Sequence, residues 1–408
     1  MKLELDLNEM TNFISKYGVD PYELCPCGSG KKYKWCCKTK IIKIKNGSEL
    51  KALYHNLKNQ TWNRRKWKTQ ICHWAGCTEE TQHCHSIQNN RFLNQICGVN
   101  KEVYHFIPMG TMENEKIELK EETISLASTF NGFCNSHDKD LFAIVERNNE
   151  ITFSLEQQYV LVYRNLFYML CKIEITQQIV ISMSLRGTPN YYSKKFQPRT
   201  LDEAKTAMDL ILELRKKQVT YQEYLELIKD IESNYDTSTH TWIIHNPTLI
   251  LSKVRTLSVT NANFCFQTVR EYLSEIEVEK KYTNPVLDNF EDKRYNYIST
   301  IILPNVEMSQ ITIFFAISKK HTTESPLKFI EYINNCTDKE LVNILNNIII
   351  DAYEELYLSK SKLYDVFPPE QQRVIKEILT QQTYNGDAPF LLDDILLNPK
   401  FNFISIPH

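Results

Sequence analysis

The sequence predicts an α+β fold in which two small cysteine-rich modules precede a helix-rich body with an antiparallel β-hairpin or sheet. The first observation is cysteine placement, because nine of the twelve cysteines precede residue 135. The second is a set of helix-start patterns behind residue 147, each followed by apolar residues at helical spacing. The third is a pair of β-rich runs on either side of residue 304. At 408 residues the chain is long enough for more than one domain.

The composition is that of an ordinary globular protein. Hydrophobic residues make up 42% and charged residues 24% of the chain, which excludes a disordered polypeptide. The sequence has no apolar run long enough for a transmembrane helix, and its first ten residues are acidic without an apolar signal core. We therefore expect a cytoplasmic protein that does not enter a membrane. In that reducing compartment, cysteines more often bind metal than form disulfides.

Four segments are predicted along the chain. They are a first cysteine module at 1–40, a basic linker at 41–70, a cysteine- and histidine-containing module at 71–146, and an α+β body of unknown function at 147–408. The first module should open with a short amphipathic helix, because Met10, Phe13 and Ile14 fall on one side of it.

Capping boxes predict where helices of the body begin. Each pairs a Ser or Thr with a Glu or Gln three residues later, and apolar side chains follow at helical spacing. The three pairs are Ser154 with Gln157, Thr200 with Glu203, and Thr337 with Glu340.

Strand patterns lie between the second and third of these helices. The runs 297–303 and 310–318 are β-rich, and we expect them to form an antiparallel hairpin with Pro304 and Asn305 between them. Residues 241–251 and 254–259 are further candidate strands.

Four cysteines in the first module have the spacing of a metal site. Two close pairs are separated by eight residues, and Gly28 and Gly30 permit a tight turn between them because glycine adopts positive φ. Four thiolates can surround one tetrahedral zinc ion at about 2.3 Å each. Metal binding would then supply folding free energy on the order of 10 kcal/mol, because so short a segment has little apolar surface. The predicted ligands are Cys25, Cys27, Cys36 and Cys37.

This segment resembles the SEC-C motif, first recognised at the C-terminus of the SecA translocation ATPase. The family takes Cys or His as its last ligand, and Cys37 occupies that position here. The resemblance implies a zinc site and a docking element that contacts protein partners or ribosome-like surfaces. It implies no catalysis.

A second ligand set is predicted between residues 72 and 137. Cys72 and Cys77 have the spacing of a zinc knuckle, and Cys134 and His137 form a second pair where a helical pattern begins. Such a knuckle and helix-start pair build the Cys₃His site of a treble clef. Alternatives remain, because His85 could replace His137, and His83 or Cys84 could replace one ligand.

The second module resembles zinc-containing HNH nucleases. The resemblance implies that His85 is a general base, that Asp138 holds a second metal such as Mg or Mn, and that Asn131 is the middle asparagine. The implied chemistry is metal-assisted phosphodiester hydrolysis. The chain departs from the family at Cys84, where an acidic metal ligand usually precedes the histidine.

The charge distribution points to a polyanion as partner. Residues 28–68 hold thirteen Lys or Arg and one acid, 13 − 1 = +12, whereas the whole chain has a formal charge of −2. Basic residues neutralise phosphates, and tryptophan stacks on unpaired bases. The alternatives are a solvated lysine face, or tryptophans that pack the two modules together. The predicted nucleic-acid-binding strip, which we call the basic strip, is Arg64, Arg65, Lys66, Trp67 and Lys68.

Three functions are therefore compatible with the sequence. The favoured one is a zinc-dependent protein that binds DNA or RNA through its first third, with a regulatory, oligomerising or sensing body. By analogy, this combination suits bacterial host defence. The second is an active HNH-type nuclease that uses His85. The third is a non-catalytic adaptor that docks onto protein through the SEC-C module.

Overall fold

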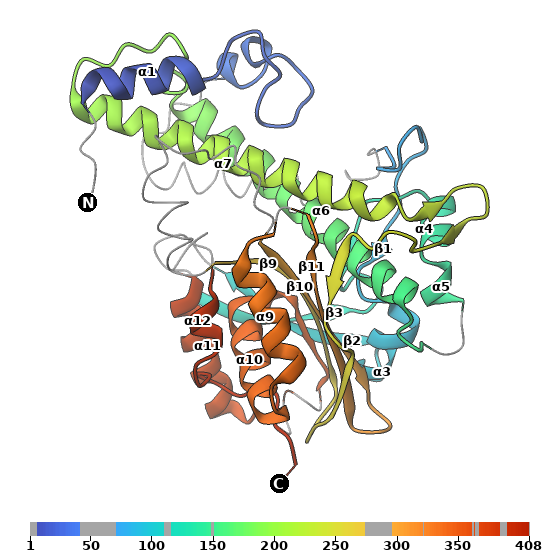
Figure 1. The fold of residues 1–408 in the computed structure, drawn as a ribbon. Helices are drawn as coiled ribbons and strands as arrows, with labels where there is room; N and C mark the ends of the chain where they lie inside the picture. The colour runs from blue at the N-terminus through green and yellow to red at the C-terminus, as the bar shows by residue number, and fades with distance from the viewer. Residues whose placement is uncertain are drawn as a thin grey trace. The chain divides into compact units, whose positions relative to one another are not determined.

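The computed structural model describes residues 6–40, 71–109, 116–147, 151–273, 296–320, 322–360, 363, 367–383 and 390–407. It confirms the α+β class, with helices and mainly antiparallel sheets (Figure 1). The chain divides into two compact units. Unit 1 comprises Met1–Ile71, Leu170–Glu226 and Glu279–Lys293, and unit 2 comprises Cys72–Met169, Leu227–Val278 and Arg294–His408. Residues 6–40 thus share a unit with part of the predicted body, and the predicted four-segment boundaries stay a prediction.

Unit 1 is built around the predicted N-terminal helix. Helix α1 spans Leu7–Tyr17, its start is closed by a capping box between Asp6 and Glu9, and its predicted apolar face is buried. That face joins a hydrophobic core with side chains of residues 181–214. Gly18 ends the helix where another residue would not fit, because a Cβ there would lie 2.6 Å from the carbonyl oxygen of Ile14 and 2.7 Å from the amide nitrogen of Lys194.

Two long helices begin at predicted capping boxes. Helix α6 spans Leu155–Gly187, and the amide of Gln157 donates to Ser154 Oγ at 3.3 Å. Helix α7 spans Leu201–Glu232, and the amide of Glu203 donates to Thr200 Oγ1 at 3.2 Å. The described helices include none that is long and apolar enough to cross a membrane.

Unit 2 contains a nine-stranded sheet. Its main path runs β3-β2-β12-β9-β10-β11-β7, with β8 paired to β11 and β13 paired to β9. Every pairing is antiparallel except that of β13 with β9. The strands are β2 Glu102–Met109, β3 Lys116–Thr123, β7 Leu249–Leu251, β8 Arg255–Ser258, β9 Phe264–Leu273, β10 Tyr297–Asn305, β11 Gln310–Ser318, β12 Leu356–Leu358 and β13 Phe390–Leu391. Strands β2 and β3 come from the predicted second module, so that module and the body share one sheet.

The predicted hairpin is confirmed, with one difference. Strands β10 and β11 pair from Ile298 with Ile317 to Asn305 with Gln310. The expected break at Pro304 is absent, because Pro304 pairs with Ile311. The β9 ladder ends at Ile302, so Pro304 lies where β10 has a single partner strand, as a proline in a sheet requires.

Helices cover one face of this sheet (Figure 1). They are α9 Glu324–Asn335, α10 Asp338–Asp351 and α11 Pro369–Thr383. Their apolar side chains share a core with the strands, in which Phe315 packs edge-on against Phe329 with ring centroids 5.4 Å apart.

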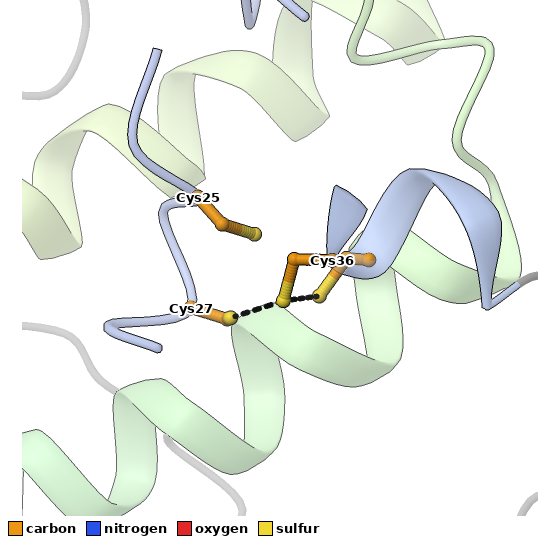
Figure 2. A group of neighbouring side chains, drawn as sticks. Cys25, Cys27 and Cys36 are labelled. Carbon is orange, nitrogen blue, oxygen red and sulfur yellow. Dashed lines mark hydrogen bonds between the residues drawn. The ribbon is translucent and has the colours of Figure 1, made fainter. Parts of the chain in front are cut away.

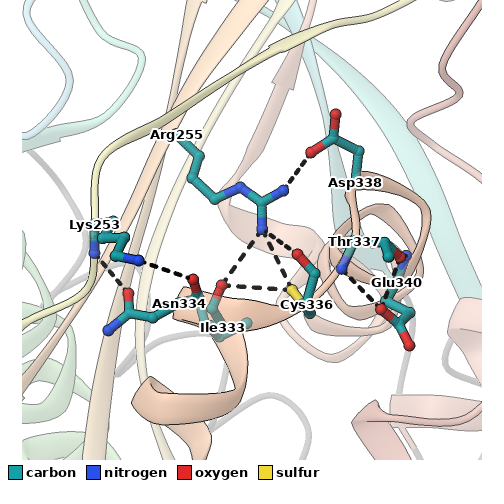
Figure 3. Close-up of polar contacts among 8 residues, drawn as sticks. All are labelled: Lys253, Arg255, Ile333, Asn334, Cys336, Thr337, Asp338 and Glu340. Carbon is teal, nitrogen blue, oxygen red and sulfur yellow. Dashed lines mark hydrogen bonds and ion pairs between the residues drawn. The ribbon is translucent and has the colours of Figure 1, made fainter.

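The turn between α9 and α10 is fixed to the segment that carries β8 (Figure 3). Arg255 donates to the carbonyl of Cys336 at 2.8 Å and forms an ion pair with Asp338. Thr337 and Glu340 form the predicted capping box at the start of α10.

Short elements complete the described part of the chain. Strand β1 (Cys84–His85) pairs with β4 (Thr129–Phe130), and β5 (Tyr235–Asp236) pairs with β6 (Thr241–Trp242). The short helices are α3 Asn94–Ile96, α4 Asn135–Leu141, α5 Ala143–Glu146 and α12 Leu392–Ile395, and helical turns cover Tyr33–Trp35, Cys37–Thr39, Asn89–Leu93 and Tyr353–Glu355.

Candidate metal centres

The first cysteine cluster lies on a tight backbone turn in unit 1. The amide of Cys25 donates to the carbonyl of Lys31 at 2.7 Å, and Leu24 bridges to Lys32. Gly28 and Gly30 have φ of 75° and 69°, so both adopt the positive φ that the sequence predicted. Two 3₁₀ turns follow, and they place the second cysteine pair opposite the first.

The four thiols of this cluster are spaced for a shared ion. Their sulfur atoms lie within 4.8 Å of one another, and all four residues are buried. Cys27 Sγ lies 3.5 Å from Cys36 Sγ, which lies 4.0 Å from Cys37 Sγ (Figure 2). A tetrahedral ion with bonds of about 2.3 Å separates its ligand sulfurs by about 3.8 Å. Hydrogen bonds from Cys25 and Cys37 lower the pKa of the Cys27 thiol, whereas hydrogen bonds to Cys27 and Cys37 and burial raise the pKa of Cys25. These residues could therefore hold a metal ion.

This cluster belongs to a packed core. Cys25, Cys27, Cys36 and Cys37 share a hydrophobic cluster with Ile181, Leu185, Ala207 and Ile211 of the long helices. Tyr33, which is 1% exposed, donates from its hydroxyl to the carbonyl of Pro189 at 3.3 Å. The module is thus joined to the rest of unit 1 by apolar and polar contacts.

The second cluster combines two segments of unit 2. The amide of Cys72 donates to the carbonyl of Glu79 at 2.9 Å, and Gly76 has φ of 80°, so residues 72–79 form a knuckle. Cys134 is the N-cap of α4, and His137 lies in its first turn. The amide of His73 donates to the carbonyl of Gly132 at 2.9 Å, which holds the knuckle beside the helix start.

The ligand atoms of Cys72, Cys77, Cys134 and His137 lie within 4.8 Å of one another. His137 Nδ1 lies 3.1 Å from Cys134 Sγ and 3.5 Å from Cys72 Sγ, so Nδ1 is the nitrogen that faces the cluster. Burial lowers the pKa of His137, which favours the neutral imidazole that a metal binds. This set could hold a second metal ion.

The alternative ligands lie outside this set. Cys84 is fully buried, and its thiol faces the carbonyl oxygens of Gln82 and Phe133 at 3.6 and 3.8 Å. Burial raises the pKa of Cys84, so the residue is a protonated thiol. His83 is exposed, and neither cluster of ligand atoms contains His83, Cys84 or His85.

His85 is held by the backbone of the opposite strand. Its register partner on β4 is Thr129, and its Nδ1 lies 3.1 Å from the carbonyl oxygen of Ala127. A carbonyl only accepts, so Nδ1 carries the proton and Nε2 keeps its lone pair. Burial lowers the pKa of His85 to about 4, so the ring is neutral at pH 7.

The same peptide unit links His85 to the nine-stranded sheet. The amide of Ser128 donates to the hydroxyl of Tyr357 at 2.9 Å. This amide and the Ala127 carbonyl belong to one peptide plane, so Tyr357 on β12 fixes the group that orients His85. Tyr357 is buried and stacks on His105 with centroids 5.5 Å apart.

Asp138 lies in a polar cluster with Cys84 and Arg164. It occupies the first turn of α4, and burial raises its pKa, while Arg164 and a hydrogen bond from Cys84 oppose that rise. Arg164 is 1% exposed, forms an ion pair with Glu146 and lies over the Phe142 ring at 3.9 Å. Arg164 was not among the site residues predicted from the sequence, although an arginine inside an apolar helical stripe indicates a buried, paired charge.

The remaining predicted site residues are Asn131 and the basic strip. Asn131 is 4% exposed and lies three positions before Cys134, the first residue of the second ligand pair. The basic strip, residues 64–68, lies outside the described residues. Comparison with known proteins gives no match to any family model, curated protein or solved structure. Functional conclusions therefore rest on the residues of this chain.

Proposed function

We propose that this chain is a zinc-stabilised protein that binds nucleic acid through its first third. The observation that carries the proposal is the net charge of +12 between residues 28 and 68, because this stretch runs from the first cysteine cluster to the start of the second. A run of cations in the sequence between two cysteine clusters suits a phosphate backbone better than a neutral partner.

Zinc is the proposed metal because of the donor sets. Four thiolates, or three thiolates and an imidazole, in tetrahedral spacing favour zinc over hard cations such as magnesium. The SEC-C and HNH resemblances point the same way. Elemental analysis of purified protein should give two zinc ions per chain, and one ion or none would contradict the two-site scheme.

The basic strip provides the test of nucleic-acid binding. Reversing Arg64, Arg65 and Lys66 to Glu should weaken DNA or RNA binding at least tenfold at low salt, and should flatten the dependence of affinity on salt. Fluorescence anisotropy with labelled oligonucleotides measures both effects.

A charge-matched control separates the strip from the overall charge. Lys328, Lys339 and Arg373 are exposed residues of unit 2, and their reversal to Glu changes the net charge equally. Binding should survive this change. Equal losses in both triple variants would mean that net charge alone drives binding, and absence of binding by the natural protein would favour the docking adaptor.

Phosphodiester hydrolysis is a second candidate function, favoured by the geometry of His85. The ring is outside both ligand sets, its Nδ1–H donates to Ala127, and Nε2 is left to accept a proton from water. Asp138 would hold a divalent ion such as Mg or Mn, which supplies charge stabilisation to the leaving oxygen. Cys84 opposes this role, because its thiol rather than a carboxylate neighbours Asp138.

His85→Ala tests this second candidate against a close control. Cleavage of DNA or RNA in Mg²⁺ or Mn²⁺ should fall by roughly 10², while both structural metals are retained. His83→Ala, two residues away and exposed, should leave cleavage unchanged. Loss of metal from His85→Ala would instead make His85 a ligand, and retained cleavage with retained metal would exclude the catalytic role.

A further inference from the structure

An exposed group of aromatic and basic side chains lies on the outside of the first cysteine cluster. Tyr22, Leu24 and Trp35 are 64%, 68% and 63% exposed, which is unusual for large apolar residues so close to a buried core. Lys34 Nζ lies 3.9 Å from the centroid of the Tyr22 ring and 4.3 Å from that of Trp35. We call Tyr22, Leu24, Lys32, Lys34 and Trp35 the aromatic–lysine face.

The backbone beneath this face is rigidly held. The amide of Lys34 donates to the carbonyl of Pro21 at 3.0 Å, and that of Tyr33 donates to the carbonyl of Glu23 at 2.9 Å. Leu24 directly precedes Cys25 and Trp35 directly precedes Cys36, so the turns that bury the thiols also position the exposed side chains next to them. A ligand would therefore meet two preorganised aromatic surfaces.

The charge of this face is positive even when the metal site is included. Residues 24–40 contain five lysines and no acid. Four thiolates around a divalent ion contribute a formal charge of about −2, which leaves an excess of about +3. The nearest acid, Glu23, is engaged by Arg215 at 3.3 Å. Lys31, Lys32, Lys38 and Lys40 are exposed and Lys34 is half-buried, whereas the sulfur ligands are buried.

We infer that the aromatic–lysine face binds single-stranded nucleic acid, with bases stacked on Trp35 and Tyr22 and phosphates near Lys32 and Lys34. The inference deepens the proposed function and rests on it. Every base has a flat face that stacks on an exposed indole or phenol, while lysines neutralise the backbone. A duplex hides its bases, so it offers this face only phosphates. The positive stretch continues along the chain from Cys37 to the basic strip, which favours an extended polyanion over a short acidic peptide.

Full-length protein and a fluorescein-labelled 15-mer of deoxythymidine provide the test. Trp35→Ala should weaken binding about tenfold, and Trp35→Phe should restore most of it, because a phenyl ring also stacks. Tyr332→Ala, which removes an aromatic ring 38% exposed in unit 2, should change nothing. Reversal of Lys31, Lys32 and Lys34 to Glu should lower the slope of affinity against salt. A duplex of the same length should bind more weakly and should be insensitive to Trp35→Ala.

Photo-crosslinking of the natural protein gives a readout that does not depend on folding of a variant. An oligonucleotide with 5-iodouracil should crosslink to Trp35 or Tyr22, and peptide mass spectrometry identifies the site. Equal affinities of the Trp35→Ala and Tyr332→Ala variants, with crosslinks only elsewhere, would overturn the inference and leave the proposed function standing. Absence of any oligonucleotide binding would overturn both. Polyglutamate or anionic vesicles that compete at equal charge would also overturn it, because the face would then bind any polyanion.

Discussion

The two cysteine clusters have the same number of ligands but reach it by different routes. The first gathers its ligands from residues 25–37, and the second from two segments that include a gap of 57 residues between Cys77 and Cys134. The largest separation between consecutive ligands of the first is 9 positions, between Cys27 and Cys36. Closing the longer loop costs about 1.6 kcal/mol more in chain entropy. A local cluster can therefore form from turn geometry, whereas the second depends on the surrounding fold.

The surroundings of the clusters differ as well. The first is enclosed by aliphatic side chains of unit 1, and its exposed side carries aromatic rings and lysines. The second shares unit 2 with the polar group of His85, Asp138 and Arg164. The first arrangement suits stability and contact with a partner. The second places groups that can accept or donate protons beside a structural site.

The largest expected effect comes from removing one cysteine ligand from each cluster, because each loss should destabilise a different unit of the chain. Cys134→Ser should remove one metal ion and lower the free energy of unfolding of unit 2 by more than about 4 kcal/mol, because it removes the residue that joins the knuckle to α4. Cys25→Ser should also remove one ion, but the damage should stay in unit 1. Elemental analysis and hydrogen exchange measured by peptide mass spectrometry check both results.

The peptide pattern is the control in this experiment. In Cys25→Ser, exchange should rise in residues 7–40 and 181–214, which share one core, while residues 297–318 stay protected. A module that folded independently would instead show faster exchange in residues 7–40 alone. Faster exchange in the same peptides for both variants would contradict the division into separately stabilised clusters.

The first cluster could be predicted almost completely from the sequence. Its ligands and its two turn glycines are encoded within residues 25–37, so spacing alone brought them together. The helix starts at Ser154, Thr200 and Thr337 were predictable for the same reason, since a capping box is a local pattern.

Contacts between residues far apart in the chain could not be predicted from the sequence. Pairing of β1 with β4 joins residues more than forty positions apart, and it sets both the Ala127 contact and the orientation of His85. Strands β2 and β3 were not predicted, because β3 is mostly charged, β2 contains Pro108, and β12, which pairs with β2, lies far along the chain. The burial of Arg164 could not be predicted either, because it depends on the contacts with Glu146 and Phe142 that form in the fold.

An intermediate effect comes from the pH dependence of His85 in unit 2. The pKa of His85 falls from 6.5 to about 4 on folding. Between these values the unfolded chain binds a proton that the folded protein does not, so the free energy of unfolding falls as the pH is lowered. His85→Asn should remove about 2 kcal/mol of this loss between pH 7 and pH 4.5, after allowance for partial exposure of the ring. Urea unfolding at a series of pH values measures it.

Acid also releases metal from thiolates. The effect of His85 is therefore measured as the difference in the pH dependence of unfolding between His85→Asn and the natural protein. Metal loss affects the natural protein and His85→Asn alike, and the exposed His83→Asn should behave as the natural protein does. Identical pH profiles for all three proteins would mean that His85 is protonated as easily in the folded chain as in the unfolded one.

The smallest expected effect compares two serines that hydrogen-bond to a ligand sulfur. Ser29 Oγ lies 3.0 Å from Cys36 Sγ, and Ser136 Oγ lies 3.2 Å from Cys134 Sγ. A metal-bound thiolate only accepts, so each serine must donate its single proton. Ser136 Oγ also lies 3.1 Å from Glu79 Oε2, so the sulfur and this carboxylate compete for the one hydroxyl proton. Hydrogen bonds with Cys134 and Ser136 lower the pKa of Glu79, which keeps it ionised as an acceptor.

Removal of the two serines should therefore change the metal affinity of the two clusters by different amounts. Ser29→Ala should weaken metal binding at the first cluster about tenfold, whereas Ser136→Ala should weaken it at the second only about twofold to threefold. Titration with Co²⁺ against a chelator distinguishes the sites, because four thiolates and three thiolates with an imidazole give different charge-transfer bands. Glu79→Gln should then strengthen the Ser136 contact, since a neutral amide competes less for the proton. A larger loss of metal affinity from Ser136→Ala than from Ser29→Ala would contradict this expectation. It would show that Ser136 donates its proton to Cys134 Sγ, and that another group holds Glu79 in place.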